Sequence, residues 1–465
     1  MIDHRDLLSV VRRLVAPSIL ALIADQLLGI ADTIVVGALG RGPLAALSGA
    51  TAIFVLLVSL VYGLRAGLSI LGAQYIGARD YAGFGRVVRA SAVAPLASAV
   101  IFTLAMFLGG EALLGALVGP LNVLHQGTIY LWLRALTLVP IGFEIVVLSA
   151  FNCVGDAKPT ARMLLIINGV HLPLLVILAL GAGTGHPLGI VGAGISSLLA
   201  ECAGFAYCLI AVLRRPELKI FERFDISWHL VKQSTILSLP EEAFLGAMLL
   251  PDLVMVGLVS SFGVATVAAL RAVNVVAELS FALPGPFGYA VQTVLGQRLG
   301  ARDPRGALWF HAEAMRLGTL TCAVCGGLLA ALAWPMALAL TFDRALAALA
   351  AGPMALYMLT MPLKGYSIIG ISAIRAAGDT RFSMLAGTMT SLVVLPLAWL
   401  FIDGLRMGLF GVPLAWICGW GIRSLVTLAK LRLDRWWERE PLTLPPAVQP
   451  VLLPEGDRGL EATFE

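Results

Sequence analysis

Twelve apolar segments follow one another along this 465-residue chain, and they constrain its fold more than any other feature. A helix crosses the hydrocarbon core of a bilayer with about 20 mostly apolar residues. By that length, spans are predicted near residues 14–37, 45–76, 88–110, 128–151, 161–182, 189–213, 234–259, 266–296, 308–340, 350–376, 383–402 and 409–430. Backbone polar groups find no partners in lipid, so such segments cross as helices. The sequence therefore predicts an all-α integral membrane protein with twelve transmembrane helices in the lipid bilayer.

Composition supports this class and excludes others. Only 13% of the residues are charged, whereas soluble domains carry roughly 25%. The formal net charge is +4 and no basic stripe is present, which excludes a nucleic-acid-binding protein. We find no His-rich metal cluster, nucleophile elbow or phosphate loop, so we expect no enzyme, no cofactor and no metal site. Cys322 and Cys325 lie inside an apolar segment and are interpreted as packing residues.

Lysine and arginine are concentrated on alternate loops, which sets the predicted orientation. One set of loops, on the side of the amino terminus, carries Arg79, Arg86 and Arg89; Lys158 and Arg162; Arg214, Arg215, Lys219 and Arg223; Arg298, Arg302 and Arg305; and Lys430, Arg432 and Arg435. The opposite loops carry Arg41, Arg344 and Arg406. Since cytoplasmic loops are the ones enriched in Lys and Arg, we expect a multi-pass protein of the inner (plasma) membrane with both termini cytoplasmic.

The two halves of the chain repeat each other at a fixed offset of 223 residues. The matching pairs are Pro17 and Pro240, Gly40 and Gly263, Gly77 and Gly300, and Gly155 and Gly378. Each half holds six predicted spans, so the halves share one topology and form two lobes related by a pseudo-two-fold axis along the membrane normal. We predict an amino-terminal lobe at 1–213, a cytoplasmic linker at 214–233, a carboxy-terminal lobe at 234–435 and a disordered cytoplasmic tail at 436–465. A cleft between the lobes suits alternating access.

The ordered motifs of both halves resemble those of the MATE (multidrug and toxic compound extrusion) family of efflux antiporters, closer to its DinF-like branch. In the first half they are Pro17, Ala31-Asp32-Thr33 with Gly37, Ala73-Gln74 with Gly77-Ala78, Arg134 with Pro140, and Gly155-Asp156. In the second half they are Val267-Ala268-Ala269, Gly296-Gln297 with Gly300-Ala301, and Ile374-Arg375 with Gly378-Asp379-Thr380. The resemblance covers nearly the whole chain. It implies export of organic compounds coupled to inward proton or sodium flow.

Acidic residues inside the first span are the leading candidates for proton coupling. A charge at mid-bilayer costs about 2.5–3.5 kcal/mol, so it persists where it faces a cleft, a partner or a pathway. Asp32 matches the acidic position of the family's first helix. Asp25 lies seven residues earlier, nearly two turns, and so is predicted on the same face. The two acids either share a proton or bind a cation, or else Asp25 is the partner of an arginine.

The fifth and sixth spans depart from the family pattern. Asn168 and Pro173 match, but Leu172 stands where the DinF-like branch has an Asp. His171 is adjacent, and an ideal helix turns it away by about 100°, so it is either a structural residue or a modulator of the proton site. Ser197 matches a usual Thr and is predicted to donate to the same cluster.

The carboxy-terminal half lacks the acids of a sodium site. Lys364 and Met248 occupy the positions at which NorM-like relatives carry Asp and Glu. Hard cations need several oxygen ligands and an ammonium repels them. We therefore expect protons rather than sodium as the coupling ion. Asp252 is a further candidate acid of the cleft.

Several other polar and aromatic side chains are predicted to line the cleft. They are Tyr62, Arg65, Arg271, Asn274, Glu278, Lys364 and Tyr366. Two interpretations of the basic members compete: they neutralise buried acids, or the cleft accepts anionic or zwitterionic substrates.

The sequence thus favours a secondary antiporter that exports small organic compounds against protons and is functional as a monomer. The alternatives are a lipid-linked-precursor flippase of the same superfamily and a sodium-coupled exporter.

Overall fold

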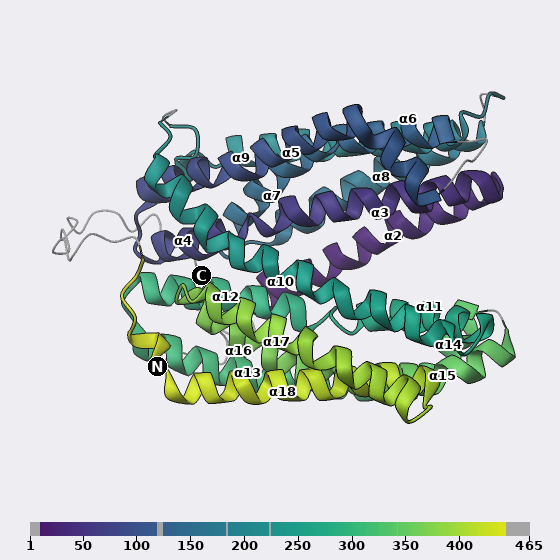
Figure 1. The fold of residues 1–465 in the computed structure, drawn as a ribbon. Coiled ribbons are helices and arrows are strands. Elements are labelled where there is room, and N and C mark those ends of the chain that lie inside the picture. The colour runs from purple at the N-terminus through teal and green to yellow at the C-terminus, as the bar shows by residue number, and fades with distance from the viewer. Residues whose placement is uncertain (1–9, 119–123, 183–184, 223–224, 342, 443–465) are drawn as a thin grey trace.

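The computed structural model describes residues 10–118, 124–182, 185–222, 225–341 and 343–442, which form two groups of helices packed side by side (Figure 1). The described residues contain helices and connecting loops but no strand. This is the arrangement that lipid imposes, because each helix satisfies its own backbone hydrogen bonds.

The amino-terminal lobe is formed by the first half of the chain. Its helices are η1 (Val11–Val15), α2 (Ala16–Ala38), α3 (Arg41–Gly63), α4 (Ala66–Gly77), α5 (Tyr81–Val118), α6 (Leu124–Leu136), α7 (Leu138–Cys153), α8 (Lys158–Leu180) and α9 (Gly189–Leu213). A short helix, η2 (Pro216–Leu218), follows in the connection to the second lobe. Within this lobe α8 packs between α2 and α9.

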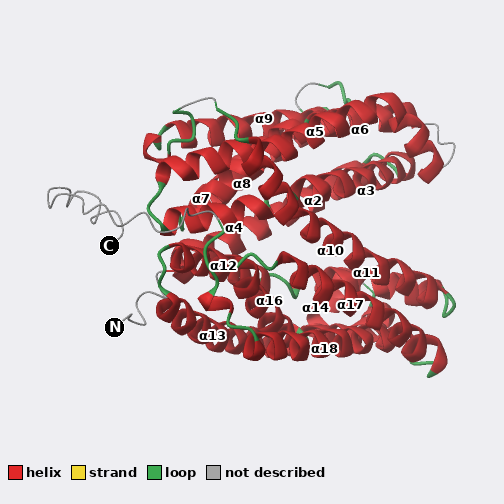
Figure 2. Cartoon of the chain, turned by 60° about the vertical axis from the view of Figure 1, so that its left-hand side comes forward, coloured by secondary structure: helices red, strands yellow, loops and turns green. Residues whose placement is uncertain are grey.

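The carboxy-terminal lobe is formed by the second half. Its helices are α10 (Trp228–Ser260), α11 (Val264–Leu279), α12 (Pro284–Gly300), α13 (Pro304–Ala331), α14 (Ala333–Thr341), α15 (Arg344–Met358), α16 (Met361–Ala376), α17 (Thr380–Trp399), η3 (Leu400–Gly404), η4 (Gly408–Phe410), α18 (Gly411–Leu433) and η5 (Trp436–Glu438). Here α16 packs against α12, α13 and α18. Seen from a second direction, the two lobes remain separate groups of helices (Figure 2).

The predicted spans correspond to these helices, several of which are broken. In the described part of the chain, ten helical segments are long and apolar enough to cross a membrane. The two other predicted spans correspond to α10 and to α11 with α12, which carry charged residues such as Glu241, Glu242 and Arg271. Breaks divide α6 from α7 and α15 from α16 at Thr137 and Thr360, which are equivalent positions of the repeat. Pro140 and Pro362 follow these breaks, as expected of residues suited to the first turn of a helix.

The backbone reproduces the repeat in detail. Positive φ angles recur at equivalent glycines: 117° at Gly40 and 101° at Gly263, and 88° at Gly155 and 87° at Gly378. Glycine adopts this region without steric cost, which explains why the repeat retains it at these turns. The turn after α4 and the turn after α12 also match, since each begins at a glycine and continues through Ala-Arg-Asp.

The lobes contact each other tightly where α4 crosses α12. The α-carbon of Gly77 lies directly against the backbone carbonyl of Gln297, and that of Gly300 against the carbonyl of Gln74, so neither position has room for a β-carbon. The Gln74 side-chain amide donates to the Ala376 carbonyl at 2.9 Å, and that of Gln297 to the Cys153 carbonyl at 2.6 Å. All these pairs are equivalent under the repeat. We call this pseudo-symmetric contact the seal.

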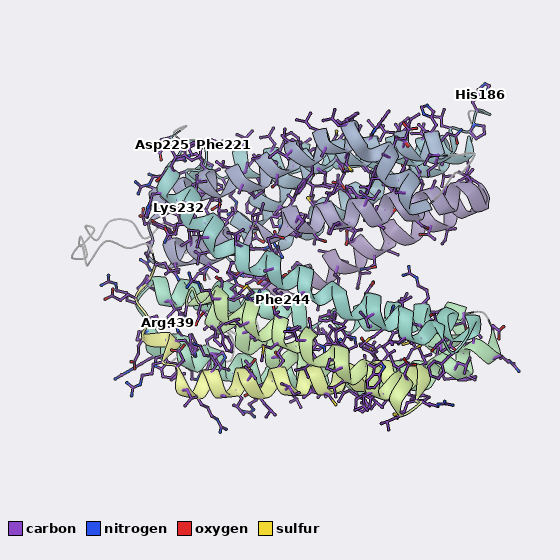
Figure 3. All side chains as sticks on the ribbon, in the orientation of Figure 1. His186, Phe221, Asp225, Lys232, Phe244 and Arg439 are labelled. Atoms are coloured by element: carbon purple, nitrogen blue, oxygen red, sulfur yellow. The ribbon has the colours of Figure 1, made fainter. Side chains whose placement is uncertain are left out.

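The basic loops gather at the end of the molecule where the seal lies. Residues from η1, from the turn after α7, from η2 and from α12 line one cavity of about 1030 Å³ there. Its lining includes Arg12, Lys158, Arg215, Lys219 and Arg298. Asp225, Lys232 and Arg439 lie at this same end, whereas His186 lies at the opposite end (Figure 3). The basic loops therefore share one side, as the charge pattern predicts.

The boundaries of the linker and tail need correction. The helix α10 begins at Trp228, six residues before the predicted start of the carboxy-terminal lobe at 234. The predicted disordered tail begins too early, because Trp436 is buried and its ring packs edge-on against His311 at 5.1 Å. Beyond it, the Leu442 N–H donates to the Gln74 side chain at 3.0 Å. Residues 443–465 of the predicted tail lie outside the described part.

Asp379 links α17, α18 and the residues after η5 outside the membrane-spanning segments. Its Oδ1 accepts the Phe382 N–H at 3.0 Å, and its Oδ2 lies 3.1 Å from Lys430 Nζ and 3.3 Å from Arg439 Nη2. Burial alone would raise the pKa of this carboxyl. The Phe382 N–H and the two cations outweigh burial and hold the pKa below its ordinary value.

We predict that Asp379→Ala lowers the stability of the protein at neutral pH by about 1 kcal/mol or more, because it removes a helix N-cap. A lowered native pKa stabilises the fold above the unfolded pKa of about 3.9, and this contribution is lost as pH falls through the native value. Thermal unfolding in detergent at pH 7 and at pH 3 measures both effects. A gap between parent and variant that widens at low pH would contradict the assignment.

Candidate functional site: an interlobe pocket and a buried acid–histidine pair

A pocket of about 250 Å³ lies between the lobes, beside the seal. Both lobes contribute to it: the junction of α3 and α4 from the first, and α10, α12 and α16 from the second. Its polar lining residues are Ser59, Tyr62, Arg65, Ser69, Glu241, Tyr289, Gln292 and Arg375. The predicted cleft between the lobes therefore has a polar and aromatic floor.

Arg65 is the central cation of this floor. It lies at the break between α3 and α4, and its guanidinium is 5.1 Å from the Tyr62 ring centroid and 4.7 Å from that of Tyr289. Contacts of this kind stabilise a desolvated cation. Across the pocket, Arg375 Nη1 lies 2.7 Å from Glu241 Oε1 in a well-buried ion pair. The floor thus holds one arginine paired with a carboxylate and one held between tyrosine rings.

Asp32 and His171 form a second site within the amino-terminal lobe. Asp32 Oδ1 on α2 lies 2.9 Å from His171 Nε2 on α8, and the two side chains are only 14% and 3% exposed. The other ring nitrogen of His171 lies 3.4 Å from the hydroxyl of Ser196 on α9. Asn168, one turn earlier on α8, donates to the Ala24 carbonyl of α2 at 3.0 Å. A carboxyl group and an imidazole ring from two different helices are therefore in direct contact.

This geometry corrects two expectations about the cluster. His171 does not turn away from Asp32. Its spacing of three residues from Asn168 places both on the face of α8 that meets α2, whereas Leu172 is 37% exposed on another face. Ser196, rather than the predicted Ser197, is the serine beside His171: both hydroxyls donate to the Ala193 carbonyl, but that of Ser196 also lies 3.4 Å from the His171 ring.

Asp25 has different surroundings from Asp32. It is exposed on α2, and the charged group that acts on it is Arg134. Arg134 itself lies over the Phe54 ring at 3.8 Å. These surroundings agree with Asp25 as the partner of an arginine, rather than as a residue that shares a proton or a cation with Asp32.

Lys364 does not line the pocket, contrary to expectation. It is completely buried inside the carboxy-terminal lobe, where its ammonium donates to the Ser280 hydroxyl. Aromatic rings surround it, with centroids at 4.0 Å for Phe281, 5.1 Å for Tyr357 and 5.7 Å for Trp420. A lysine side chain at 364 needs this cage, because an apolar lobe offers no water to solvate the charge.

The remaining residues predicted to line the cleft lie in three different kinds of surroundings. Arg271 and Glu278 are exposed on α11 and interact electrostatically, and Asn274 lies half-buried between them. Tyr366 is not a cleft residue, since it packs against the apolar core that contains Phe287 and Phe310. The side chains of Asp252 and Met248 lie outside the described residues.

Sequence reasoning missed two acids, the buried Glu144 on α7 and the half-buried Glu201 on α9. Glu144 is 3% exposed, and the two carboxyl groups lie within hydrogen-bond reach of each other. Both residues fall inside predicted spans. The criterion that singled out Asp32, an acidic residue inside an apolar span, would also have found these two.

The MatE family profile matches residues 17–177 and 247–400, one segment in each lobe. The chain belongs to the MatE family. This MatE protein is 26% identical over 453 residues to the Probable multidrug resistance protein NorM of Caulobacter vibrioides, covering 92% of both chains. It is 28% identical over 305 residues to the DNA damage-inducible protein F of Escherichia coli, covering 62% of this chain and 63% of the relative.

Solved structures confirm the predicted fold of this MatE protein. An outward-facing multidrug resistance MATE family transporter of the MOP superfamily superposes with a TM-score of 0.84 at 20% identity, over 92% of this chain and 95% of the other. A MOP superfamily transporter from Pyrococcus furiosus Vc1, described as having a binding pocket of reverse polarity, gives 0.83 at 19% identity, with the same two coverages. The all-α, two-lobed membrane architecture is therefore that of MATE transporters.

Proposed function

We propose that this MatE protein exports small organic compounds in exchange for protons that enter through the amino-terminal lobe. The contact between Asp32 and His171 carries the proposal, because a carboxylate and an imidazole joined at 2.9 Å can accept and release a proton as their surroundings change. Relatives named as multidrug resistance proteins support efflux as the direction and organic compounds as the cargo. The MatE profile favours this function over a lipid-linked-precursor flippase.

The proposed cycle uses the seal as one of its two gates. With the seal closed, the proton site exchanges with the side opposite the basic loops. Protonation of Asp32 removes the charge that attracts His171, which loosens α2 from α8 and releases the exported compound. Opening of the seal then delivers the proton to the other side. Each step shifts a pre-existing equilibrium between two conformations.

Three further assignments belong to the proposal. The basic loops are expected in the cytoplasm, which places both termini there and the protein in the inner (plasma) membrane. Two lobes in one chain provide the complete interlobe pocket, so a monomer suffices for transport. The domain division is an amino-terminal lobe to residue 213 and a carboxy-terminal lobe from α10 onward.

We favour protons over sodium as the coupling ion. Lys364 replaces an acid of the NorM-like pattern and places a cation inside the carboxy-terminal lobe. Arg423 adds a second buried cation there, between the rings of Phe244 and Trp420 at 4.9 Å each. Sodium needs several oxygen ligands, which these residues do not offer.

The coupling ion is tested by loading proteoliposomes with ethidium and imposing either a proton gradient or a sodium gradient at fixed pH. We expect ethidium transport with the proton gradient and only the background of protein-free vesicles with the sodium gradient. Transport driven by sodium alone would overturn the assignment.

The pocket also supports a second candidate cargo, compounds that carry an anionic group. Arg65 lines the pocket and is held by tyrosines rather than by a carboxylate contact. Lys364 and Arg423 lie in the lobe behind the floor and add positive potential. A solved structure of the same fold is described as having a binding pocket of reverse polarity, which supports an anionic cargo as a second candidate.

This second cargo leads to a direct prediction for Arg65→Gln. A charge-assisted contact contributes about 1.5–3 kcal/mol, so the variant should weaken fluorescein transport about 10- to 100-fold while retaining ethidium transport. Arg86→Gln is the matched control, because Arg86 is exposed at the start of α5, away from the pocket. If the parent protein transports no fluorescein, the anionic cargo is excluded.

A further inference from the structure

The acid pair missed by sequence reasoning, Glu144 and Glu201, lies apart from the Asp32–His171 contact in the amino-terminal lobe. Glu144 projects from α7 and Glu201 from α9, and their carboxyl groups approach within hydrogen-bond reach. Gly204, one turn after Glu201 on α9, provides the space: a β-carbon at 204 would lie 2.8 Å from Glu144 Oε1 and 2.8 Å from the Ile167 side chain. The carboxyl of Glu144 therefore fills a notch in α9.

This pair lacks the partners that normally stabilise buried carboxylates. Glu144 Oε1 and Glu201 Oε2 are both buried and accept no hydrogen bond from any described group. Leaving a buried carboxylate oxygen unpaired is costly, so the observation calls for an explanation. No interaction of the mechanism described above uses these two residues.

The charged and titratable groups around the pair come from four neighbouring helices. Arg134 from α6, Asp25 from α2 and His171 from α8 act on Glu201, and Tyr62 from α3 and Cys208 from α9 lie within electrostatic range of both acids. Arg134 is the nearby cation, but it lies over the Phe54 ring. Its single charge is also shared with Asp25.

Hydrogen bonding between two carboxyl groups requires a proton on one of them. Two ionised carboxylates in contact repel each other strongly in a medium of low dielectric, and one shared proton turns that repulsion into a bond. A proton shared by Glu144 and Glu201 therefore explains how the two carboxyl groups can lie so close together. Loss of this proton would push α7 and α9 apart. The same helix α9 carries Ser196, which contacts His171, so a shift of α9 would reach the Asp32 site.

We propose that Glu144 and Glu201 form a second proton-binding site of the amino-terminal lobe, loaded separately from the Asp32–His171 pair. This site would add a second proton to the proton-coupled export proposed above. The part of the proposal that concerns transport therefore rests on that proposed function. With two sites in one lobe, each transport cycle carries two protons instead of one.

The first test detects the bound proton without transport. Infrared difference spectra of the reconstituted parent between neutral and alkaline pH should show a protonated carboxylic acid, and this band should persist in Asp32→Asn. Glu144→Gln and Glu201→Gln should each remove or shift it, while Glu111→Gln, an exposed glutamate of α5 in the same lobe, should not. A parent spectrum without the band, or a band unaffected by both glutamine variants, overturns the site.

The second test counts protons per exported ethidium in the same vesicles. Because a glutamine amide keeps a hydrogen bond to the remaining carboxyl, a purely structural role predicts an unchanged count. We expect each glutamine variant that elutes as a folded protein to halve the count. An unchanged count with an altered infrared band overturns the coupling. Absence of proton-driven ethidium transport in the parent would instead refute the proposed function, while the infrared test of the pair still stands.

Discussion

Asp32→Asn should reduce proton-driven ethidium export to the background of protein-free vesicles while leaving the protein folded. The amide has the size of the carboxyl and can still hydrogen-bond His171 across the 2.9 Å contact, so the cost in stability should be about 1 kcal/mol or less. What the amide cannot do is bind and release a proton at this site. Ethidium fluorescence in proteoliposomes with an imposed pH gradient measures the loss, and the melting temperature in detergent checks the fold.

Counterflow separates loss of coupling from loss of the binding pocket. The variant should still exchange internal for external ethidium when no gradient is imposed, because the interlobe pocket is untouched. Its ethidium binding should be weaker than in the parent, because the amide resembles the protonated acid that releases the compound. Asp225→Asn is the matched control, since Asp225 is exposed just before α10, at the end of the molecule where the basic loops lie (Figure 3), and pairs with Arg89 at 2.7 Å. Normal gradient-driven export by Asp32→Asn would refute Asp32 as the coupling residue.

Gly77→Ala and Gly300→Ala should each open the seal. Their β-carbons would overlap the carbonyl groups of Gln297 and Gln74, so the two helix backbones must separate. Overpacking of this kind costs about 1–3 kcal/mol, which is a factor of about 5 to 150 in the ratio of closed to open seal. Spin labels introduced at Arg86 and Arg305, one in each lobe and both exposed near the seal, should report a longer distance.

The controls for the seal use glycines with free space around them. Gly327→Ala places its β-carbon in open space on α13, so the label distance should equal that of the parent. The double variant Gly77→Ala with Gly300→Ala should add little beyond either single change, because one clash already separates the helices. Unchanged distances in both single variants would show that the contact of α4 with α12 does not control this gate.

The membrane spans, the shared side of the basic loops and the internal repeat could be predicted from the sequence, because each depends on the residues of a short segment. Apolar length defines a span, loop charge defines a side, and glycine recurs at two pairs of equivalent turns with positive φ, Gly40 with Gly263 and Gly155 with Gly378. The helix breaks at Thr137 and Thr360 were not predicted, since apolar length alone does not show where a membrane helix stops and restarts.

Side-chain contacts between helices were predicted less well. An ideal helix places His171 about 100° from Leu172, but only packing decides which of them meets α2. Lys364 was predicted in the cleft because a charge in a span usually faces water. The rings around Lys364 come from three distant parts of the chain, Phe281 in the turn after α11, Tyr357 on α15 and Trp420 on α18, so no local sequence pattern predicts them. Glu144 and Glu201 lie 57 positions apart and become a pair only in the fold.

The reciprocal contacts of the seal have the form of an interface between two copies of one subunit, in which residue i meets j and j meets i. In such a dimer every buried charge would occur twice. Here the equivalents of Asp32, His171 and Glu144 are Met255, Val394 and Ser367, while those of Lys364 and Arg423 are Ile141 and Ala200. Joining both halves in one polypeptide therefore allows these positions to differ, so that Asp32, His171 and Glu144 occur in one lobe only and Lys364 and Arg423 in the other lobe only.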